Sequence, residues 1–222
     1  MRALVCVLFM FVASHVNAVQ VYDDFSMPKW TAFNTPGVSV YEQSGRLKID
    51  FFRTATGYEI EGGYSSTCRL EGDYDLSVDF YAPVFPLGNG VRVGLITSPV
   101  AGTVAPTVDP VGRAISELVA NPNESLYLSD FSPIGMDTSS AVITSDTSGR
   151  FRIKRVGSEL TGYYWDKVAR RWVMTGLALS FIADPVYITL ASWTRDFYFQ
   201  KVPVKVAFDN VKITTGNCVK PI

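Results

Sequence analysis

Residues 149–172 read GRFRIKRVGSELTGYYWDKVARRW, and this stretch decides the class of fold that we predict. Polar and apolar side chains alternate from Arg150 to Lys154, the chain turns at Val156-Gly157-Ser158, and the alternation then resumes. A period of two is typical of a strand with one buried face, and a tight turn between two such strands indicates an antiparallel hairpin. The stretch therefore predicts an antiparallel sheet that packs one face on a core.

The same alternation recurs about every ten residues, whereas helical periodicity is almost missing. In residues 72–81, GDYDLSVDFY, every second side chain from Tyr74 to Phe80 is apolar, and the side chains between them are polar. Strands are predicted at 19–25, 38–42, 46–52, 57–61, 64–70, 73–81, 91–97, 113–119, 125–131, 149–156, 159–166, 170–175, 186–194 and 203–214. Fourteen strands joined by turns predict an all-β domain of two packed antiparallel sheets.

Residues 1–18, MRALVCVLFMFVASHVNA, have the pattern of a secretory signal peptide. Arg2 precedes an apolar run from Ala3 to Ala13, and Val16-Asn17-Ala18 suits cleavage before Val19. A membrane anchor is the alternative, although the run is shorter than the roughly 18 to 20 residues that a span needs. We therefore expect residues 19–222 to form one secreted or periplasmic domain with no membrane span.

Charge and histidine content exclude several classes of function. Cleavage would remove Arg2 from 20 basic residues and none of the 21 acidic ones, which leaves a net charge of −2. Nucleic acid is not an expected partner, because its binding needs a clustered positive excess. The sole histidine, His15, would leave with the leader, so the remaining chain has no Ser-His-Asp or Cys-His nucleophile and no histidine metal site.

Two cysteines, Cys68 and Cys218, would remain in the exported chain. An even number in an oxidising compartment predicts one disulfide, and two separate buried thiols are the alternative. Such a bond would close a loop of about 150 residues, for which the loss of chain entropy in the unfolded state predicts a stabilisation of about 5 kcal/mol.

Several segments, in order, resemble the concanavalin A-like lectin/glucanase superfamily in a LamG-like, bacterial secreted form. They are DDFS (23–26) with Trp30, GDYDLSVDFY (72–81), VRVGLIT (91–97), the stretch from Thr147 to Asp166 with Trp172, and VAFDNVKI (206–213). The resemblance spans about residues 22–214. It implies a jelly-roll sandwich of two curved sheets, in which the concave face or its edge loops contact glycans.

Catalysis is a weaker expectation than binding. The hydrolases of this superfamily carry alternating acids on one strand, because residues two apart share a face and a retaining mechanism needs two close carboxyl groups. This chain lacks such a run of three acids, and its nearest equivalents are Glu59 with Glu61 and the set Asp73, Asp75 and Asp79, of which the glutamates are the main candidates. A solvated strand face is the favoured explanation of these acids, so the superfamily's catalytic residues are not carried over.

Aromatic side chains next to polar ones predict a sugar-binding surface, since sugar rings stack on tyrosine and tryptophan. In the 149–172 stretch, Tyr164 shares the core face with Phe151, whereas Tyr163 and Trp165 point outward. The predicted ligand-binding residues are Tyr163, Trp165, Tyr187, Trp193, Arg92, Asp75, Asp79 and Arg152. The alternative is that Trp165 and Trp172 only hold their own hairpin together.

Two other features remain open. Asp23, Asp24 and Asp209 lie on the first and last predicted strands and together could hold a structural calcium ion, or Asp209 could mark a bulge. Residues 98–112, rich in Pro and Gly, form the longest predicted loop, which either borders a site or is an uninvolved excursion.

The sequence as a whole predicts a secreted carbohydrate-binding (lectin-like) or adhesion module without catalysis. Its expected partner is a glycan or polysaccharide, and no cofactor is required. The alternatives are a glycoside hydrolase with a carboxylate pair and a structural extracellular domain that binds protein.

Overall fold

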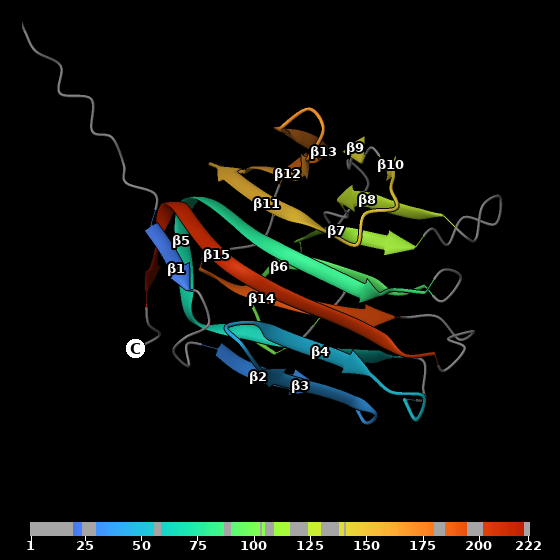
Figure 1. Cartoon of the computed structure of the whole chain (residues 1–222). Coiled ribbons are helices and arrows are strands. Elements are labelled where there is room, and N and C mark those ends of the chain that lie inside the picture. Colours follow the sequence, from blue (N-terminus) through green and yellow to red (C-terminus); the bar gives the residue numbers. More distant parts are fainter. Residues whose placement is uncertain are drawn as a thin grey trace, which may run out of the picture.

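The computed structural model describes residues 20–23, 30–55, 59–86, 90–102, 104, 109–115, 124–129, 138–139, 141–179, 185–194 and 202–219. These residues form strands and their connections (Figure 1). The strands are β1 Gln20–Asp23, β2 Trp30–Asn34, β3 Val38–Glu42, β4 Leu47–Phe51, β5 Ile60–Val84, β6 Arg92–Ser98, β7 Asp109–Ile115, β8 Ser125–Ser129, β9 Thr138–Ser139, β10 Val142–Ile143, β11 Ser148–Val156, β12 Glu159–Asp166, β13 Arg171–Leu179, β14 Val186–Thr194 and β15 Val204–Val219. Within these ranges no helix is long and apolar enough to cross a membrane.

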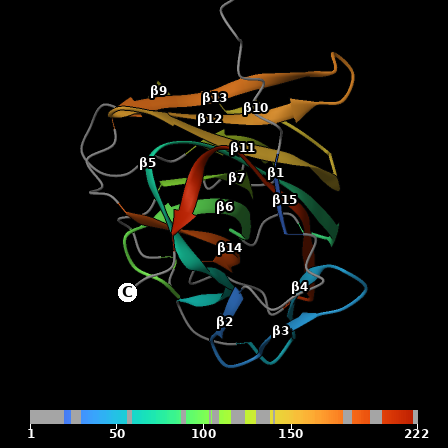
Figure 2. The same cartoon turned by 90° about the vertical axis from the view of Figure 1, so that its left-hand side faces the viewer.

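Two antiparallel layers share the long strand β5. Its first half pairs with β14 and β2, and its second half pairs with β11 and β15. We call the layer of β10, β8, β7, β6, β14, the first half of β5 and β2 the β14 sheet. The layer of β9, β13, β12, β11, the second half of β5, β15, β4 and β3, with β1 on β15, is the β11 sheet. Figure 2 shows β11, β12 and β13 above β6, β7 and β14.

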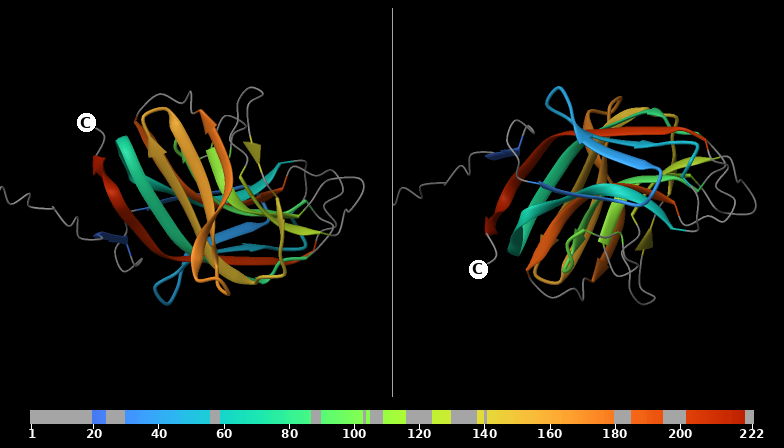
Figure 3. Two further views of the ribbon diagram at one scale, coloured as in Figure 1. Left: turned by 90° about the horizontal axis from the view of Figure 1, so that it is seen from above. Right: turned by 90° about the horizontal axis from the view of Figure 1, so that it is seen from below.

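Strand β5 passes from one layer to the other at residues 71–73, which are exposed. Gly72 lies in the middle of this bend with a φ of 66°, a conformation that glycine adopts at low cost. Strand β15 runs beside β5 across the bend, and Figures 1 and 3 show the two strands following each other along the molecule. This shared pair holds the two layers together.

Aromatic side chains from both layers meet in the core. The Phe80 and Phe151 rings stack with centroids 4.2 Å apart, and the Tyr127 and Tyr164 rings stack at 4.3 Å. Tyr127 comes from the β14 sheet, and its ring also meets the edges of the two phenylalanine rings. Stacked and edge-on aromatic pairs add about 0.5 to 1.5 kcal/mol each beyond their buried area. The prediction that Tyr164 and the apolar set from Tyr74 to Phe80 face the core is confirmed.

The structure confirms the all-β fold of antiparallel sheets and corrects several strand boundaries. The predicted strands 57–61, 64–70 and 73–81 are one continuous β5, so the turns expected between them are wrong. Only glycine fits at positions 62 and 63 of this strand, because neighbouring atoms approach the backbone closely there. A Cβ on Gly62 would lie 2.5 Å from Val38 Cγ1, and one on Gly63 would lie 2.5 Å from the Leu190 carbonyl oxygen.

Other boundaries shift by a few residues. Strand β7 begins at Asp109 and ends at Ile115, earlier than the predicted 113–119, and pairs with β8 as a hairpin. Strand β15 extends to Val219, and β2, β9 and β10 are strands that the alternation did not predict. The predicted leader, residues 1–18, lies outside the described residues.

Candidate ligand-binding surfaces

Ion pairs between neighbouring strands cover the outer face of the β11 sheet. Arg152 on β11 binds Asp75 on β5 with both prongs of its guanidinium, and its Nε lies 2.7 Å from Asp75 Oδ1. Two residues earlier on β11, Arg150 Nε lies 3.0 Å from Asp79 Oδ1. The hydrogen bond to Asp75 raises the pKa of Arg152 despite the opposing effect of burial. These pairs fix the guanidinium groups in place on the sheet.

The aromatic residues of this face lie beside the arginines. The Arg152 guanidinium lies 5.3 Å from the Tyr163 ring centroid and 5.5 Å from that of Trp172, and Arg150 lies 5.6 Å from that of Trp165. Trp165 and Trp172 pair edge to face at 5.3 Å. Tyr163, Trp165, Asp75, Asp79 and Arg152, all predicted ligand-binding residues, are thus brought together on one face. The Trp165–Trp172 pair is the contact that the alternative, a hairpin held together by its own tryptophans, requires, and the assignment of these residues to a ligand stays a prediction.

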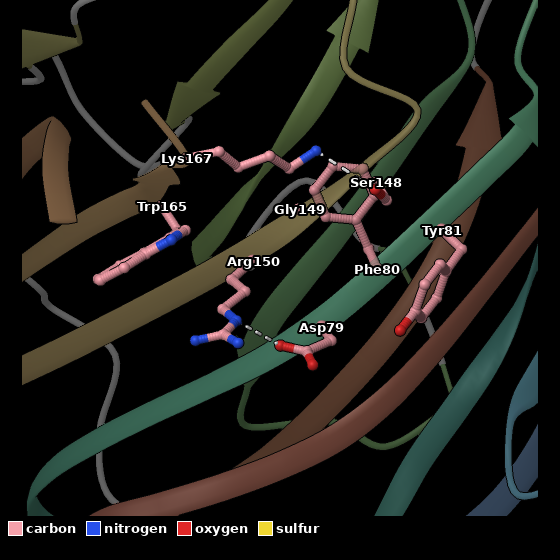
Figure 4. Close-up of a pocket in the computed structure, with 8 residues that line it drawn as sticks. All are labelled: Asp79, Phe80, Tyr81, Ser148, Gly149, Arg150, Trp165 and Lys167. Carbon is pink, nitrogen blue, oxygen red and sulfur yellow. Dashed lines mark hydrogen bonds and ion pairs between the residues drawn. The ribbon is translucent and has the colours of Figure 1, made fainter. Parts of the chain in front are cut away.

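A pocket of about 230 Å³ opens on this face beside Trp165 (Figure 4). We call it the Trp165 pocket. Its lining residues are Asp79, Phe80, Tyr81, Ser148, Gly149, Arg150, Trp165 and Lys167. They come from β5, β11, the end of β12 and the turn after it, so three adjacent strands build the pocket.

Fixed hydrogen-bonding groups surround the Trp165 pocket. Asp79 Oδ2 accepts a hydrogen bond of 3.0 Å from Asn210 Nδ2, in addition to its ion pair with Arg150. Opposite, Lys167 Nζ donates to Ser148 Oγ at 3.3 Å and lies 3.4 Å from Asp146 Oδ1. Figure 4 shows the Lys167 and Arg150 contacts on two sides of the opening. The pocket therefore presents positively charged donors and a negatively charged acceptor beside the Trp165 ring.

A second arginine holds the far side of the pocket. The Arg46 guanidinium lies 3.9 Å from the Tyr81 ring centroid, and Arg46 Nε lies 3.2 Å from Asp209 Oδ2. The Tyr81 side chain, which extends from β5, therefore packs on the Arg46 guanidinium. Each of the three cations near the pocket, Arg46, Arg150 and Lys167, has a carboxylate partner. The site has no large excess of either charge, which suits a neutral polar ligand.

The β14 sheet places Tyr187 and Trp193 on the opposite layer, so the two predicted aromatic pairs do not share a face. Trp193 points outward from the sheet, as the inward positions of Ile188 and Leu190 require. It is nevertheless only 8% exposed, because Val104 packs over it together with Ile96 and Ala191. The expectation that Trp193 forms an exposed platform is therefore wrong.

The predicted loop 98–112 is in part a strand and in part a cover for this sheet. Ser98 ends β6, the described residues 99–102 and 104 follow it, and the rest of the loop that is described belongs to β7. The Gly102 backbone N–H donates to Ser65 Oγ at 2.7 Å, which fixes this segment against β5. Val104 is 4% exposed above Trp193.

Arg92 and Glu61 flank Trp193 on neighbouring strands. Arg92 is its partner on β6 and Glu61 its partner on β5, so the three side chains form one row on the outer face. Arg92 Nη1 donates to the Gly90 carbonyl oxygen at 3.0 Å. Glu59 is exposed just before β5 begins. The use of Glu59 and Glu61 as a catalytic pair stays a prediction.

Cys68 on β5 and Cys218 on β15 form a disulfide, with Cα atoms 5.3 Å apart and 150 positions apart in sequence. The predicted pairing is confirmed, and the two-thiol alternative is excluded.

The predicted calcium ligands have other partners. Asp23 is buried, and its Oδ2 accepts a 2.7 Å hydrogen bond from Trp30 Nε1. Asp209 pairs with Arg46 and accepts from the Asn210 N–H at 2.9 Å. Asp24 lies outside the described residues, among which no group of three or more His, Cys, Asp or Glu side chains is arranged to hold a metal ion. The calcium site stays a prediction.

Sequence reasoning missed Ser148, Arg150, Tyr81 and Lys167 as pocket residues. Arg150 and Tyr81 had a signal, since each lies on the outward face of a strand that the alternation identified. Lys167 had none, because its place above Ser148 depends on the path of the turn after β12.

No protein-family model matches the chain, and no curated protein is significantly similar to it in sequence. Solved structures do match. A prokaryotic β-1,3-1,4-glucanase (lichenase) from a mouse hindgut metagenome is 14% identical with a TM-score of 0.54, covering 86% of this chain and 95% of the glucanase. Lectin II from Ulex europaeus is 10% identical with a TM-score of 0.57, covering 86% and 94%.

A lectin from Bauhinia forficata, solved in complex with GalNAc, is 11% identical with a TM-score of 0.56, covering 85% of this chain and 93% of the lectin. Structural similarity at such low sequence identity establishes the fold. It leaves the activity open, since one fold supports many functions. The structural neighbours include both lectins and glycoside hydrolases. The chain has the two-sheet jelly-roll fold of the concanavalin A-like lectins and glucanases.

Proposed function

We propose that this chain is a secreted glycan-binding module without catalysis, and that the Trp165 pocket holds a single sugar ring. The observation that carries the proposal is the arrangement of Trp165 beside the Asp79–Arg150 ion pair at a pocket of about 230 Å³. Pockets for drug-sized molecules have volumes of roughly 300–1,000 Å³, so this one suits a smaller unit.

The chemistry of the lining supports a sugar as the ligand. A sugar ring presents C–H groups that pack on an indole, and its hydroxyl groups both donate and accept hydrogen bonds. Asp79 supplies an acceptor, and Arg150, Lys167 and Ser148 supply donors. Because contacts within the protein already orient these groups, little side-chain entropy is lost when a ligand binds.

The pocket favours binding over hydrolysis. Asp79 is the carboxylate among its lining residues, and Arg150 and Asn210 both donate to its oxygens. A glycosidase of the usual kind needs two carboxyl groups at the scissile bond, one of them protonated. Secretion is supported by the Cys68–Cys218 disulfide, which is stable in an oxidising compartment.

Binding of a glycan panel to wild type, Trp165→Ala and Arg150→Gln tests this function. We expect both substitutions to weaken the best ligand at least tenfold, because each removes contacts worth about 1.5 kcal/mol or more. Lys154→Gln is the matched control, since Lys154 lies on the same strand and face as Arg150 but does not line the pocket. Equal binding by wild type and Trp165→Ala would remove the pocket from the function.

A reducing-sugar assay on a polysaccharide panel separates the catalytic alternative. We expect no release by the wild type. Release that disappears in Glu59→Gln or Glu61→Gln would establish a hydrolase instead and contradict the proposal. Capture of a protein partner without any glycan signal would favour a structural protein-binding domain.

A further inference from the structure

Arg69 and Tyr187 face each other on the outer side of the β14 sheet, away from the Trp165 pocket. Arg69 on β5 is the register partner of Tyr187 on β14. The Arg69 guanidinium lies 4.8 Å from the centroid of the Tyr187 ring. Both side chains are partly exposed, so a ligand in solution can reach the pair.

The Nε of the Arg69 guanidinium lacks a hydrogen-bond acceptor. This nitrogen is buried, and the contact that the structure gives the guanidinium is the Tyr187 ring. A guanidinium stays charged at all relevant pH values, so Arg69 cannot relieve this cost by losing its proton. Buried donors of charged groups are almost always paired in folded proteins, and an exception requires an explanation.

The strand around Arg69 is shaped to hold this position. Between Tyr187 and Thr189, β14 advances two residues while β5 advances four, from Arg69 to Ser65, which makes a bulge in β5. Ser66 stabilises the bulge, because its Oγ accepts from the Ile188 N–H at 3.0 Å and donates to the Cys68 carbonyl oxygen at 2.7 Å. Bulges redirect side chains and occur often next to functional sites.

The disulfide adds rigidity directly beside Arg69. Cys68 precedes Arg69 in the chain and is bonded to Cys218, and the next residue, Val219, is the register partner of Arg69 on β15. Arg69 is therefore held by β14 on one side, by β15 on the other and by a covalent bond at the preceding residue. A donor held this way loses little entropy on binding.

We propose that Arg69 and Tyr187 form a second binding site that takes one oxyanion group, a carboxylate or a sulfate ester, carried by a glycan. A guanidinium presents two parallel N–H donors to such a group, and the Tyr187 hydroxyl is a further donor at the same place. The oxyanion specificity follows from Arg69 alone. That the oxyanion belongs to a glycan rests on the proposed function.

Calorimetric titration with three oligosaccharides tests the site. The ligands are an oligogalacturonide for carboxylates, a sulfated oligogalactan for sulfate esters and a neutral oligoglucan. We expect wild type to prefer one of the acidic ligands over the neutral one, and Arg69→Gln to reduce that preference about 10- to 100-fold. The stronger acidic ligand identifies the source of the oxyanion.

Two further variants separate charge from geometry. Arg69→Lys keeps the charge but loses the forked donors, so we expect a smaller loss than in Arg69→Gln. Tyr187→Phe removes one hydroxyl and should weaken the acidic ligand by a few fold. We also expect Arg69→Gln to melt at the same temperature as wild type or higher, because it removes a buried N–H donor that has no acceptor, whereas a purely structural arginine would lower the melting temperature.

The outcomes distinguish this site from the Trp165 pocket. An unchanged acidic preference in Arg69→Gln would overturn the second site, even if Trp165→Ala loses binding to every oligosaccharide. The preference should survive in Trp165→Ala if that variant retains measurable binding. A third outcome is that no oligosaccharide binds, but free glucuronate or sulfate raises the melting temperature of wild type and not of Arg69→Gln. That outcome would support the oxyanion site and contradict the glycan-binding function.

Discussion

Asp75 on β5 and Arg152 on β11 form a forked ion pair across two neighbouring strands, and the guanidinium also lies 5.3 Å from the Tyr163 ring centroid and 5.5 Å from that of Trp172. We predict that Asp75→Asn lowers the free energy of unfolding by about 2 kcal/mol. Loss of one partner of a buried pair costs roughly 3–5 kcal/mol, and partial exposure of Arg152 reduces that cost. Urea denaturation measures the change.

Asp79→Asn is the matched control for this pair. Arg150 is 47% exposed in its side chain, against 25% for Arg152, so solvent screens the Asp79–Arg150 pair more strongly. Its loss should cost less than about 1 kcal/mol. A double-mutant cycle of Asp75→Asn with Arg152→Gln should give a coupling energy above about 1 kcal/mol. Equal costs for the two aspartates would contradict this reading of the face.

The Cys68–Cys218 disulfide should be a major source of stability. We predict that the Cys68→Ser, Cys218→Ser double variant loses about 3–5 kcal/mol of unfolding free energy, because the bond removes much entropy from the unfolded chain. Chemical denaturation of the two proteins under oxidising conditions measures the loss. The matched control is the wild type under reducing conditions, which should show a similar loss. A difference below about 1 kcal/mol would mean that the bond contributes little.

Glu42 gives a prediction for pH. Burial, reinforced by the Asp23 carboxylate, raises the pKa of Glu42 above its ordinary value. A raised carboxyl pKa adds stability below the unfolded-state pKa, near 4.3, and that contribution is lost as pH rises through the folded-state value. We therefore expect Glu42→Gln to melt above wild type at pH 7 and the difference to shrink towards pH 4. A difference that does not change with pH would contradict the assigned cause.

Period-two alternation predicted the faces of the 149–172 stretch, because side-chain direction in a strand is a local property. It assigned Tyr164 to the core and Trp165 to the outer face, and the structure agrees on both. The alternation did not predict that β5 is continuous. Gly62 and Gly63 read as a turn, and only the close approach of Val38 and Leu190 shows why glycine is needed there.

The candidate sites were harder to predict because they depend on contacts between distant segments. The Asp79–Arg150 pair arises from the register of β5 against β11, and no local sequence pattern predicts that register. Trp193 has the outward direction that the sequence indicates, yet Val104 covers it. Arg69 had no sequence signal at all, since the lack of an acceptor for its Nε is a property of the folded surroundings.

Gly149 connects the core to the floor of the Trp165 pocket. A Cβ at this position would lie 2.7 Å from Phe80 Cε1 and 2.8 Å from the Tyr127 hydroxyl oxygen. We predict that Gly149→Ala lowers the free energy of unfolding by about 1–3 kcal/mol, because the stacked Phe80 ring must move to admit the methyl group. Gly149 and Phe80 both line the Trp165 pocket, so glycan binding should weaken in the same variant.

A second substitution tests whether the clash causes the loss. Phe80→Leu makes room beside residue 149, so the Gly149→Ala, Phe80→Leu double variant should be more stable than the sum of the two single changes predicts. Gly157→Ala is the control, since Gly157 has a φ of 59° and no atom within 4 Å of an added Cβ. Its cost of about 1 kcal/mol should come from the backbone alone and add independently to that of Phe80→Leu. If the stability losses of Gly149→Ala and Phe80→Leu were also strictly additive, a clash with the Phe80 ring would not be the cause of the loss in Gly149→Ala.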